Sequence, residues 1–252
     1  MINPESLEIV LPATIAGLMV AILHVPLGIE VLRRGIIFID LAIAQIAGLC
    51  VVLVKLWVHD ASWAITQIAA ILSALAAALF FRWIEKVAPQ EQEAVIGSSF
   101  VLAAAAILLA LANHPHGGEE VQNILSGQIL FVSWEHILAF LPIYGAGLIL
   151  WFSVVSLRQG VCFYGLFAII VTASVQLVGI YLVFASLILP ALAVNRIRKP
   201  SIGLAMGLST ISVIGGIILS TTSDLPAGPL LVFAFAAVAI ITRLVTQGTS
   251  PH

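Results

Sequence analysis

Apolar stretches long enough to cross a membrane recur along the whole chain, and they constrain its fold more than any other feature. A helix needs roughly 20 mostly apolar residues to cross about 30 Å of hydrocarbon. The chain is 62% hydrophobic and 9% charged, whereas soluble domains carry roughly 25% charged residues. Lipid offers no hydrogen-bond partners, so a spanning backbone must be helical or a closed barrel, and the alternating strands of a barrel are absent. We predict an all-α, polytopic membrane helix bundle.

Eight to nine membrane-spanning helices follow from these stretches. Five of them alternate cleanly across the bilayer, near residues 9–31, 36–54, 64–84, 93–112 and 134–154, and two more lie near residues 201–220 and 228–246. The stretch 161–195 has basic residues on both flanks, so it should cross twice although it is short for two full spans. We expect it to turn at Gly179. No Pro-rich or Ser-rich linker divides the chain, so residues 1–252 are predicted to form a single transmembrane domain.

The basic residues fall in clusters between the apolar stretches and predict the orientation of the chain. Cytoplasmic loops carry an excess of Lys and Arg. A consistent topology places all the clusters inside: Arg33-Arg34, Arg82 with Lys86, Arg158, and residues 196–199. The N-terminus is then outside and the C-terminus inside.

Asp40 is a carboxylate within the otherwise apolar run from Ile36 to Val54. An acidic side chain at the centre of a span costs roughly 2.5–3.5 kcal/mol on insertion scales, so such residues usually face a bundle interior, an ion or a partner charge. Asp40 is therefore a candidate for contact with a passing cation. Alternatively, it lies near the headgroups and pairs with Arg33 or Arg34.

Two imidazoles and two carboxylates lie close together in a predicted outer loop. They belong to His114, His116, Glu119 and Glu120. Imidazole suits zinc, copper, iron and nickel, and carboxylates widen the range toward manganese. We predict a weak docking site for a metal here. The alternative is a solvated polar loop that turns at Pro115 and the following glycines.

Other polar residues have simpler interpretations. Glu30 and Arg34 are spaced for an i, i+4 ion pair at the end of a span. His24 lies inside the first span and is predicted to be a buried histidine with its hydrogen bonds satisfied. Asp224 precedes a proline and an apolar helix, which favours a turn or N-cap role.

Motifs of the common enzyme classes are missing. The chain contains no P-loop, no dinucleotide fingerprint, no H-E-x-x-H and no G-x-S-x-G. We expect it not to be an enzyme, to bind no cofactor and to have no nucleic-acid partner. A protein with many spans and few polar residues in them more often moves a substrate across the bilayer.

Several segments resemble the zinc, manganese and iron type ABC transporter permeases (ABC-3 type). The matching segments are residues 26–48 (PLGIEVLRRGIIFIDLAIAQIAG), 96–97 (IG), 125–130 (LSGQIL), 178–191 (VGIYLVFASLILPA) and 223–229 (SDLPAGP). These segments are distributed along nearly the whole chain, and they occur in the family's order. The resemblance implies a homodimeric subunit in a bacterial inner membrane, with cytoplasmic ABC ATPase subunits and an extracytoplasmic metal-binding protein as partners. The transported substrate would be a divalent metal, with zinc first and manganese or iron next.

Two positions depart from the family's pattern. The family often has a His one helical turn after the acidic residue of the second span, where this chain has Ala44. The segment expected to dock on the ATPase is reduced to residues 156–160, so either residues 82–92 or 195–200 take over the contact, or coupling is weak. An ATPase-independent secondary transporter or efflux channel is therefore the main alternative, and a non-transporting membrane scaffold is a third.

Overall fold

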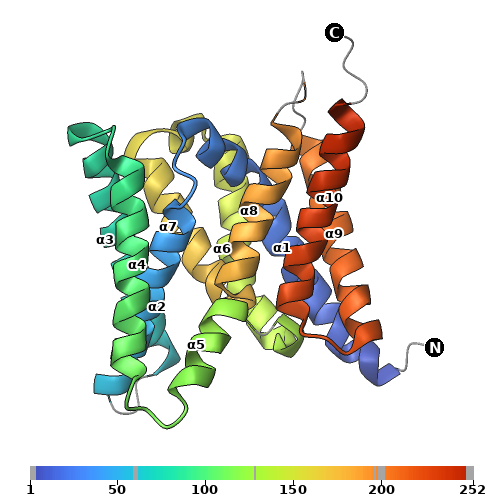
Figure 1. Cartoon of the computed structure of the whole chain (residues 1–252), viewed down its shortest axis with the longest axis horizontal. Helices are drawn as coiled ribbons and strands as arrows, with labels where there is room; N and C mark the ends of the chain where they lie inside the picture. Colours follow the sequence, from blue (N-terminus) through green and yellow to red (C-terminus); the bar gives the residue numbers. More distant parts are fainter. Residues whose placement is uncertain (1–3, 59–61, 128, 196, 198–201, 248–252) are drawn as a thin grey trace. The chain divides into compact units, whose positions relative to one another are not determined.

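The described part of the chain folds entirely into helices. The computed structural model describes residues 4–58, 62–127, 129–195, 197 and 202–247. Its helices, shown in Figure 1, are α1 (Pro4–Arg34), α2 (Ile39–Trp57), α3 (Trp63–Val87), α4 (Gln92–Leu111), α5 (Gly117–Ser126), η1 (Ile129–Phe131), α6 (Trp134–Ser153), η2 (Val155–Arg158), α7 (Gly160–Val178), α8 (Ile180–Val194), α9 (Ile202–Ser223) and α10 (Ala227–Gln247). The predicted all-α fold is confirmed.

Eight of the described helices are long and apolar enough to cross a membrane. They are α1 from Glu8 onward, α2, α3, α4, α6, α7, α9 and α10. A further apolar helix, α8, has 15 residues and is shorter than a full span. These findings confirm the prediction of eight to nine spans.

Gly179 separates α7 from α8, as the sequence predicted. Its φ angle is +81°, a conformation that glycine adopts without steric cost. A side chain here would also collide with the backbone of Gly127, which itself has a φ of +64°. Both glycines are thus required by positive φ angles and by the close approach of two backbone segments.

Two compact units make up the structure, and both combine segments that are distant in sequence. Unit 1 contains residues 1–34, 126–145 and 177–252, and unit 2 contains residues 35–125 and 146–176. The helix α6 contributes its first part to unit 1 and its last part to unit 2. The division marks no single boundary along the chain, and the single transmembrane domain stays a prediction.

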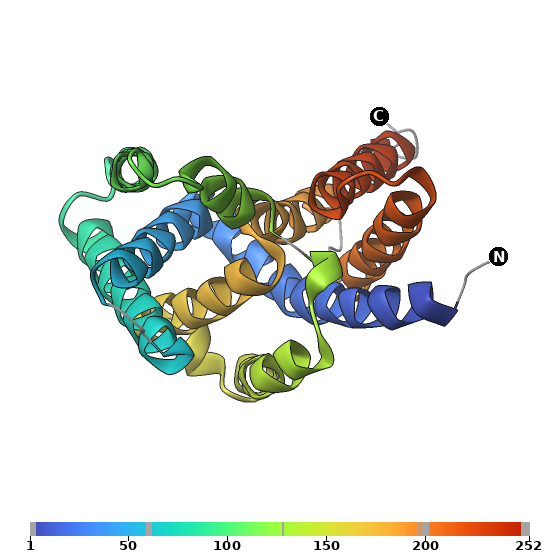
Figure 2. The same ribbon diagram turned by 90° about the horizontal axis from the view of Figure 1, so that it is seen from below.

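The helices α1, α8, α9 and α10 pack together in unit 1. Figures 1 and 2 both show α9 beside α10, and α8 packs against α1 and α10. Small residues allow close packing between these helices. Val25 of α1, Val194 of α8 and Ala205 of α9 form one buried apolar cluster.

Unit 2 is built around α2, which packs against both α3 and α4. These three helices are consecutive and joined by short connections. The helix α3, which follows α2 in the chain, runs in the opposite direction, and α4 runs in the same direction as α2. The first residues of α2 and α4 therefore lie at the same end of the unit. At the other end, Val52, Ile107 and Leu111 form a buried cluster against α5.

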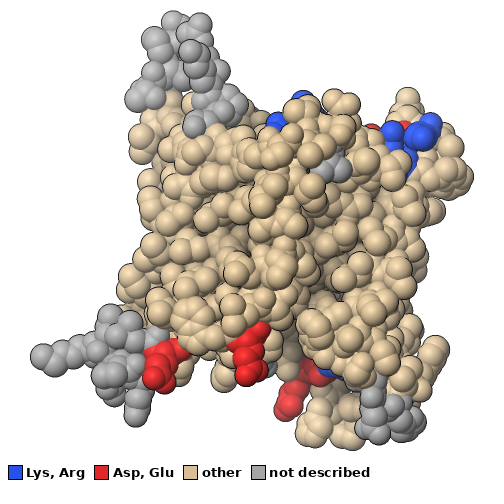
Figure 3. Space-filling view, turned by 180° about the vertical axis from the view of Figure 1, so that it is seen from behind, with Lys and Arg blue, Asp and Glu red and all other residues tan. Residues whose placement is uncertain are grey.

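Charged side chains gather at the ends of the helices. Figure 3 shows that Lys, Arg, Asp and Glu side chains take up little of the visible surface, most of which is formed by other residues. Within unit 2, Arg82 and Lys86 lie in the last turns of α3, whereas Glu119 and Glu120 lie in the first turn of α5. This separation agrees with the orientation expected from the basic clusters.

Replacement of Gly28 by Ala should destabilise unit 1. A Cβ atom at this position of α1 would collide with the carbonyl oxygen of Leu187 in α8. Overpacking of this kind costs about 1–3 kcal/mol, so the thermal midpoint in detergent should fall. Gly207→Ala is the matched control, because a Cβ atom there meets nothing within 4 Å. Equal midpoints for Gly28→Ala and the parent protein would contradict the tight α1–α8 packing.

Candidate functional site

Asp40 is the second residue of α2 and is completely buried. Neither of its carboxylate oxygens accepts a hydrogen bond from any described residue. The two nearby arginines are bound to Glu30, with Arg33 Nη2 2.7 Å from Oε2 and Arg34 Nε 2.8 Å from Oε1. The predicted Glu30–Arg34 pair is confirmed, and the alternative that Asp40 pairs with an arginine is not observed.

Glu93 is a second carboxylate near the first residues of α2. It is the second residue of α4, and its Oε1 atom accepts a hydrogen bond of 3.3 Å from the backbone N–H of Phe38. Phe38 is the N-cap of α2, two residues before Asp40. The Oε2 atom of Glu93 is buried without a partner in the described chain. Glu93 also interacts electrostatically with Asp40.

Glu93 was not among the residues predicted from the sequence, although the sequence contains one signal for it. Like Asp40, Glu93 is an acidic residue at the beginning of an apolar span. The parallel directions of α2 and α4 bring these two beginnings together. One turn after Asp40, Ala44 is buried and offers no ligand atom. In the structure, the second carboxylate near Asp40 is therefore Glu93 of α4. The position at which the family often has a His is occupied by the apolar side chain of Ala44.

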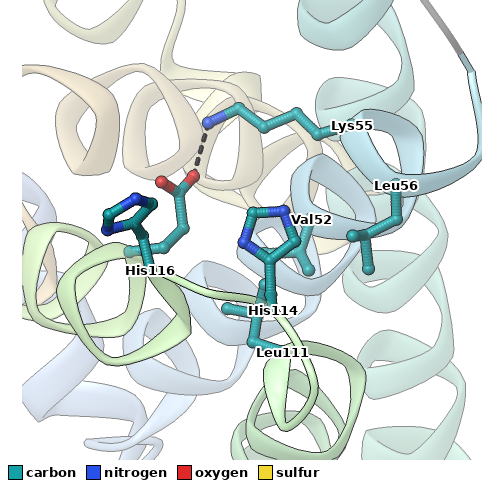
Figure 4. A pocket seen from close by; sticks show the side chains of 7 residues that line it. Val52, Lys55, Leu56, Leu111, His114 and His116 are labelled. Carbon is teal, nitrogen blue, oxygen red and sulfur yellow. Dashed lines mark hydrogen bonds and ion pairs between the residues drawn. The ribbon is translucent and has the colours of Figure 1, made fainter.

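The predicted outer site lies where α4 ends and α5 begins. A tight turn joins them. In this turn the backbone N–H of His114 donates a hydrogen bond of 3.0 Å to the carbonyl of Leu111, and the backbone N–H of Gly117 donates one of 3.0 Å to the carbonyl of His114. A side chain at Gly117 would collide with the carbonyl of Leu111, so this turn requires glycine. A cavity of about 200 Å³ lies beside this turn, and its lining residues, drawn as sticks in Figure 4, are Val52, Lys55, Leu56, Leu111, His114, His116 and Glu120.

Each of the two carboxylates, in the first turn of α5, lies beside a basic side chain. Lys55 Nζ lies 2.5 Å from Glu120 Oε1, the contact dashed in Figure 4, and His116 Nδ1 lies 3.5 Å from Glu119 Oε2. The second contact is highly exposed, with 76% and 78% of the two side chains accessible. No three or more His, Cys, Asp or Glu residues within the described ranges form a group that could hold a metal ion.

Asp40 and the outer loop are separate places on the protein. Asp40 lies in the first turn of α2, and Lys55, which contacts the loop, lies in its last turn. A rise of 1.5 Å per residue separates them by about 20 Å along the helix. The five predicted metal-binding residues therefore divide into one buried carboxylate at the beginning of α2 and four side chains beyond its end.

The connection between α6 and α7 is a short, closed turn. It contains the four-residue helix η2. The Arg158 guanidinium donates two hydrogen bonds to the carbonyl of Trp151, at 3.0 Å from Nε and 2.8 Å from Nη2. It also lies 5.5 Å from the centre of the Trp151 ring. The connection thus folds back onto the end of α6. Of the alternative contact segment 195–200, residues 196 and 198–200 lie outside the described part of the chain.

Other polar residues of the sequence analysis have structural roles. His24 is buried, and its Nδ1 atom lies 2.8 Å from the Ser186 hydroxyl, as expected for a satisfied histidine. Asp224 has a φ of +53° in the turn between α9 and α10. The predicted turn role of Asp224 is confirmed.

The fold and the sequence together define the protein's class. The model of the ABC 3 transport family matches residues 6–164 and 154–246, so the chain belongs to this family of membrane transport proteins. The two matched segments overlap at residues 154–164, the region that contains η2.

Relatives of known identity match almost the full length of the chain. The chain is 24% identical over 264 residues to the high-affinity zinc uptake system membrane protein ZnuB of Haemophilus influenzae, covering 93% of this chain and 97% of ZnuB. The structure of PsaBC from Streptococcus pneumoniae in complex with Fab is similar, with a TM-score of 0.71, 19% identity, and coverage of 95% and 94% of the two chains. A transporter described as of the metal-chelate ABC type, in an inward-facing conformation, also has a TM-score of 0.71, with 14% identity and coverage of 98% and 90%.

Replacement of Asp40 by Asn should stabilise the protein. A buried polar group without a hydrogen bond costs about 1–3 kcal/mol, and more when it is charged, whereas an amide of the same size carries no charge. The thermal midpoint in detergent at pH 8 should therefore rise. Glu91→Gln makes the same chemical change at an exposed position and should leave the midpoint unchanged. A lower midpoint for Asp40→Asn would reveal a stabilising partner of Asp40.

Proposed function

We propose that this chain is the membrane-spanning permease subunit of an ATP-driven importer of a divalent metal. The observation that carries the proposal is Asp40, a buried carboxylate without a hydrogen-bond partner among the described residues, in a span of an ABC 3 family protein. A carboxylate kept in such a place is usually retained for an ion or a substrate. Zinc is our first choice because a similar protein belongs to a zinc uptake system and because two histidines lie in the outer loop.

The proposed assembly is a homodimer that works by alternating access. ATP hydrolysis by cytoplasmic ABC ATPase subunits would switch the dimer between outward-open and inward-open states. An extracytoplasmic metal-binding protein would deliver the ion, which passes Asp40 along the dimer axis. We place the assembly in a bacterial inner membrane, with the N-terminus outside and the basic ends of the helices inside. This orientation is supported by the basic residues in the last turns of α1 and α3.

The outer loop is proposed as a weak docking place for the arriving metal. His114, His116 and Glu120 line one cavity, and Glu119 lies beside His116. In this cavity, Lys55 forms an ion pair with Glu120 and balances its charge. An arriving cation would replace Lys55 at Glu120, and Lys55 would return when the cation moves on. Because the pair is partly exposed, it contributes only about 0–1 kcal/mol, which makes the exchange easy.

An ATPase-independent secondary transporter or efflux channel is the second candidate. It is favoured by the short α6–α7 connection, in which Arg158 binds the end of α6 and the four-residue helix η2 is the only helix between the two spans. Under the ATP-driven proposal, the contact must use another inner segment. The described α3–α4 connection, from Ala88 to Glu91, is the alternative that we favour for this contact.

Purification of the tagged chain from its native membranes should recover an ABC ATPase subunit in about equal amount. The measurement is mass spectrometry of the proteins retained in mild detergent. Replacement of Pro89 and Gln90 by Gly should weaken this association if the α3–α4 connection makes the contact. Recovery of the chain as a stable dimer without an ATPase, under several mild detergents, would favour the second candidate.

Uptake of zinc into vesicles that contain the assembly should depend on Asp40. Asp40→Ala should lower the uptake rate by about tenfold or more, the scale on which removal of a metal-site partner acts. The double variant H114A/H116A should instead raise the zinc concentration needed for half-maximal uptake. His136→Ala, an exposed histidine outside the loop, is the control. Unchanged uptake by Asp40→Ala would remove Asp40 from the path, and unchanged half-saturation by the double variant would exclude the loop.

A further inference from the structure

Two carboxylates from different helices leave three oxygens without hydrogen bonds at the beginning of α2. They are both oxygens of Asp40 and the Oε2 atom of Glu93, and all three are buried. Neither carboxylate forms an ion pair within the residues that the structure describes. Buried carboxylates are normally paired or bound to a metal. The arrangement thus has the negative charge and the free ligand atoms of a cation site.

The fourth oxygen of the pair explains how Glu93 is held in position. Glu93 Oε1 accepts the hydrogen bond from Phe38 N–H at 3.3 Å, which ties the first residues of α4 to the N-cap of α2. Capping alone would use one oxygen and would be satisfied by an amide. It accounts neither for the second, buried oxygen of Glu93 nor for the complete burial of Asp40 beside it.

We propose that Glu93 is the second ligand of the transported cation, together with Asp40. This inference rests on the proposed function. It adds a second ligand, Glu93, which lies in α4 and not in the second span, α2. With Ala44 in place of a histidine, the second donor comes from α4 and not from α2. Two residues leave the remaining ligand positions to water or backbone carbonyls.

The chemistry of the ligands defines the class of cation. Carboxylate, carbonyl and water ligands suit manganese, magnesium and calcium, whereas imidazole and thiolate are the usual donors to zinc. An Asp40–Glu93 site with oxygen ligands alone therefore accepts Mn²⁺ as well as Zn²⁺. Preference for zinc, where present, would arise at the histidines of the outer loop before the ion reaches Asp40.

Binding of Mn²⁺ alone to the full-length chain, purified with its accompanying subunits into lipid nanodiscs, tests the proposal. Free Mn²⁺ is measured by electron paramagnetic resonance in the H114A/H116A background, so that the outer loop does not contribute. E93Q keeps an oxygen that can accept the Phe38 hydrogen bond but loses the charge. We expect E93Q and D40N each to weaken Mn²⁺ binding by about tenfold or more. E91Q, which alters the exposed Glu91 at the N-cap of the same helix, should bind like the background protein.

The outcomes separate this inference from the proposed function. Weakened binding in D40N with unchanged binding in E93Q would overturn the role of Glu93 and leave Asp40 in the path. Unchanged binding in both variants would overturn the role of Asp40 as well.

A second measurement needs no substitution at either carboxylate and therefore applies even if E93Q fails to fold. Mn²⁺ should protect both Asp40 and Glu93, but not Glu91, from modification by a hydrophobic carbodiimide, as measured by peptide mass spectrometry. Protection of Asp40 without Glu93 would overturn the inference.

Discussion

The hydrocarbon of a bilayer offers no hydrogen bonds, and this constraint governs nearly every polar group in the structure. Most hydroxyls in the spans satisfy this constraint by donating a hydrogen bond to a backbone carbonyl of their own helix. Thr172 and Ser174 each donate to the carbonyl four residues earlier, at 2.8 Å. Among the described buried side-chain atoms without a hydrogen bond, three of five belong to Asp40 and Glu93. This contrast supports our proposal that the two carboxylates are retained for a ligand that is not part of the chain.

The helix α2 connects the two places where we propose that a cation meets this protein. Its last turn carries Lys55, which neutralises Glu120 of the outer loop, and its first turn carries Asp40. The two ends differ in chemistry. The outer end is partly exposed and contains histidines, whereas the inner end is buried and has only carboxylate oxygens. A path along α2 would therefore select the ion in an open, hydrated site and transfer it to a dry one.

The connection between α6 and α7 is short and contains the helix η2. Its Arg158 side chain is used internally, because it holds the carbonyl of Trp151 and stacks on the same residue. The two family matches overlap in this region. Under our proposal, contact with an ATPase would therefore use another inner segment.

Sequence alone determined the helices, the turn at Gly179, the Glu30–Arg34 pair and the buried His24, because apolar length, glycine and helical spacing are local properties. Asp40 was also identified from sequence, since a charge in an apolar run is costly wherever the helix packs. Only the tertiary structure showed that Glu93 accompanies Asp40, that Lys55 occupies Glu120, and that Asp40 is not paired with the adjacent arginines. These contacts join residues that are as many as 65 positions apart. They depend on which helix ends meet, and the hydrophobic pattern of a span does not encode its neighbours.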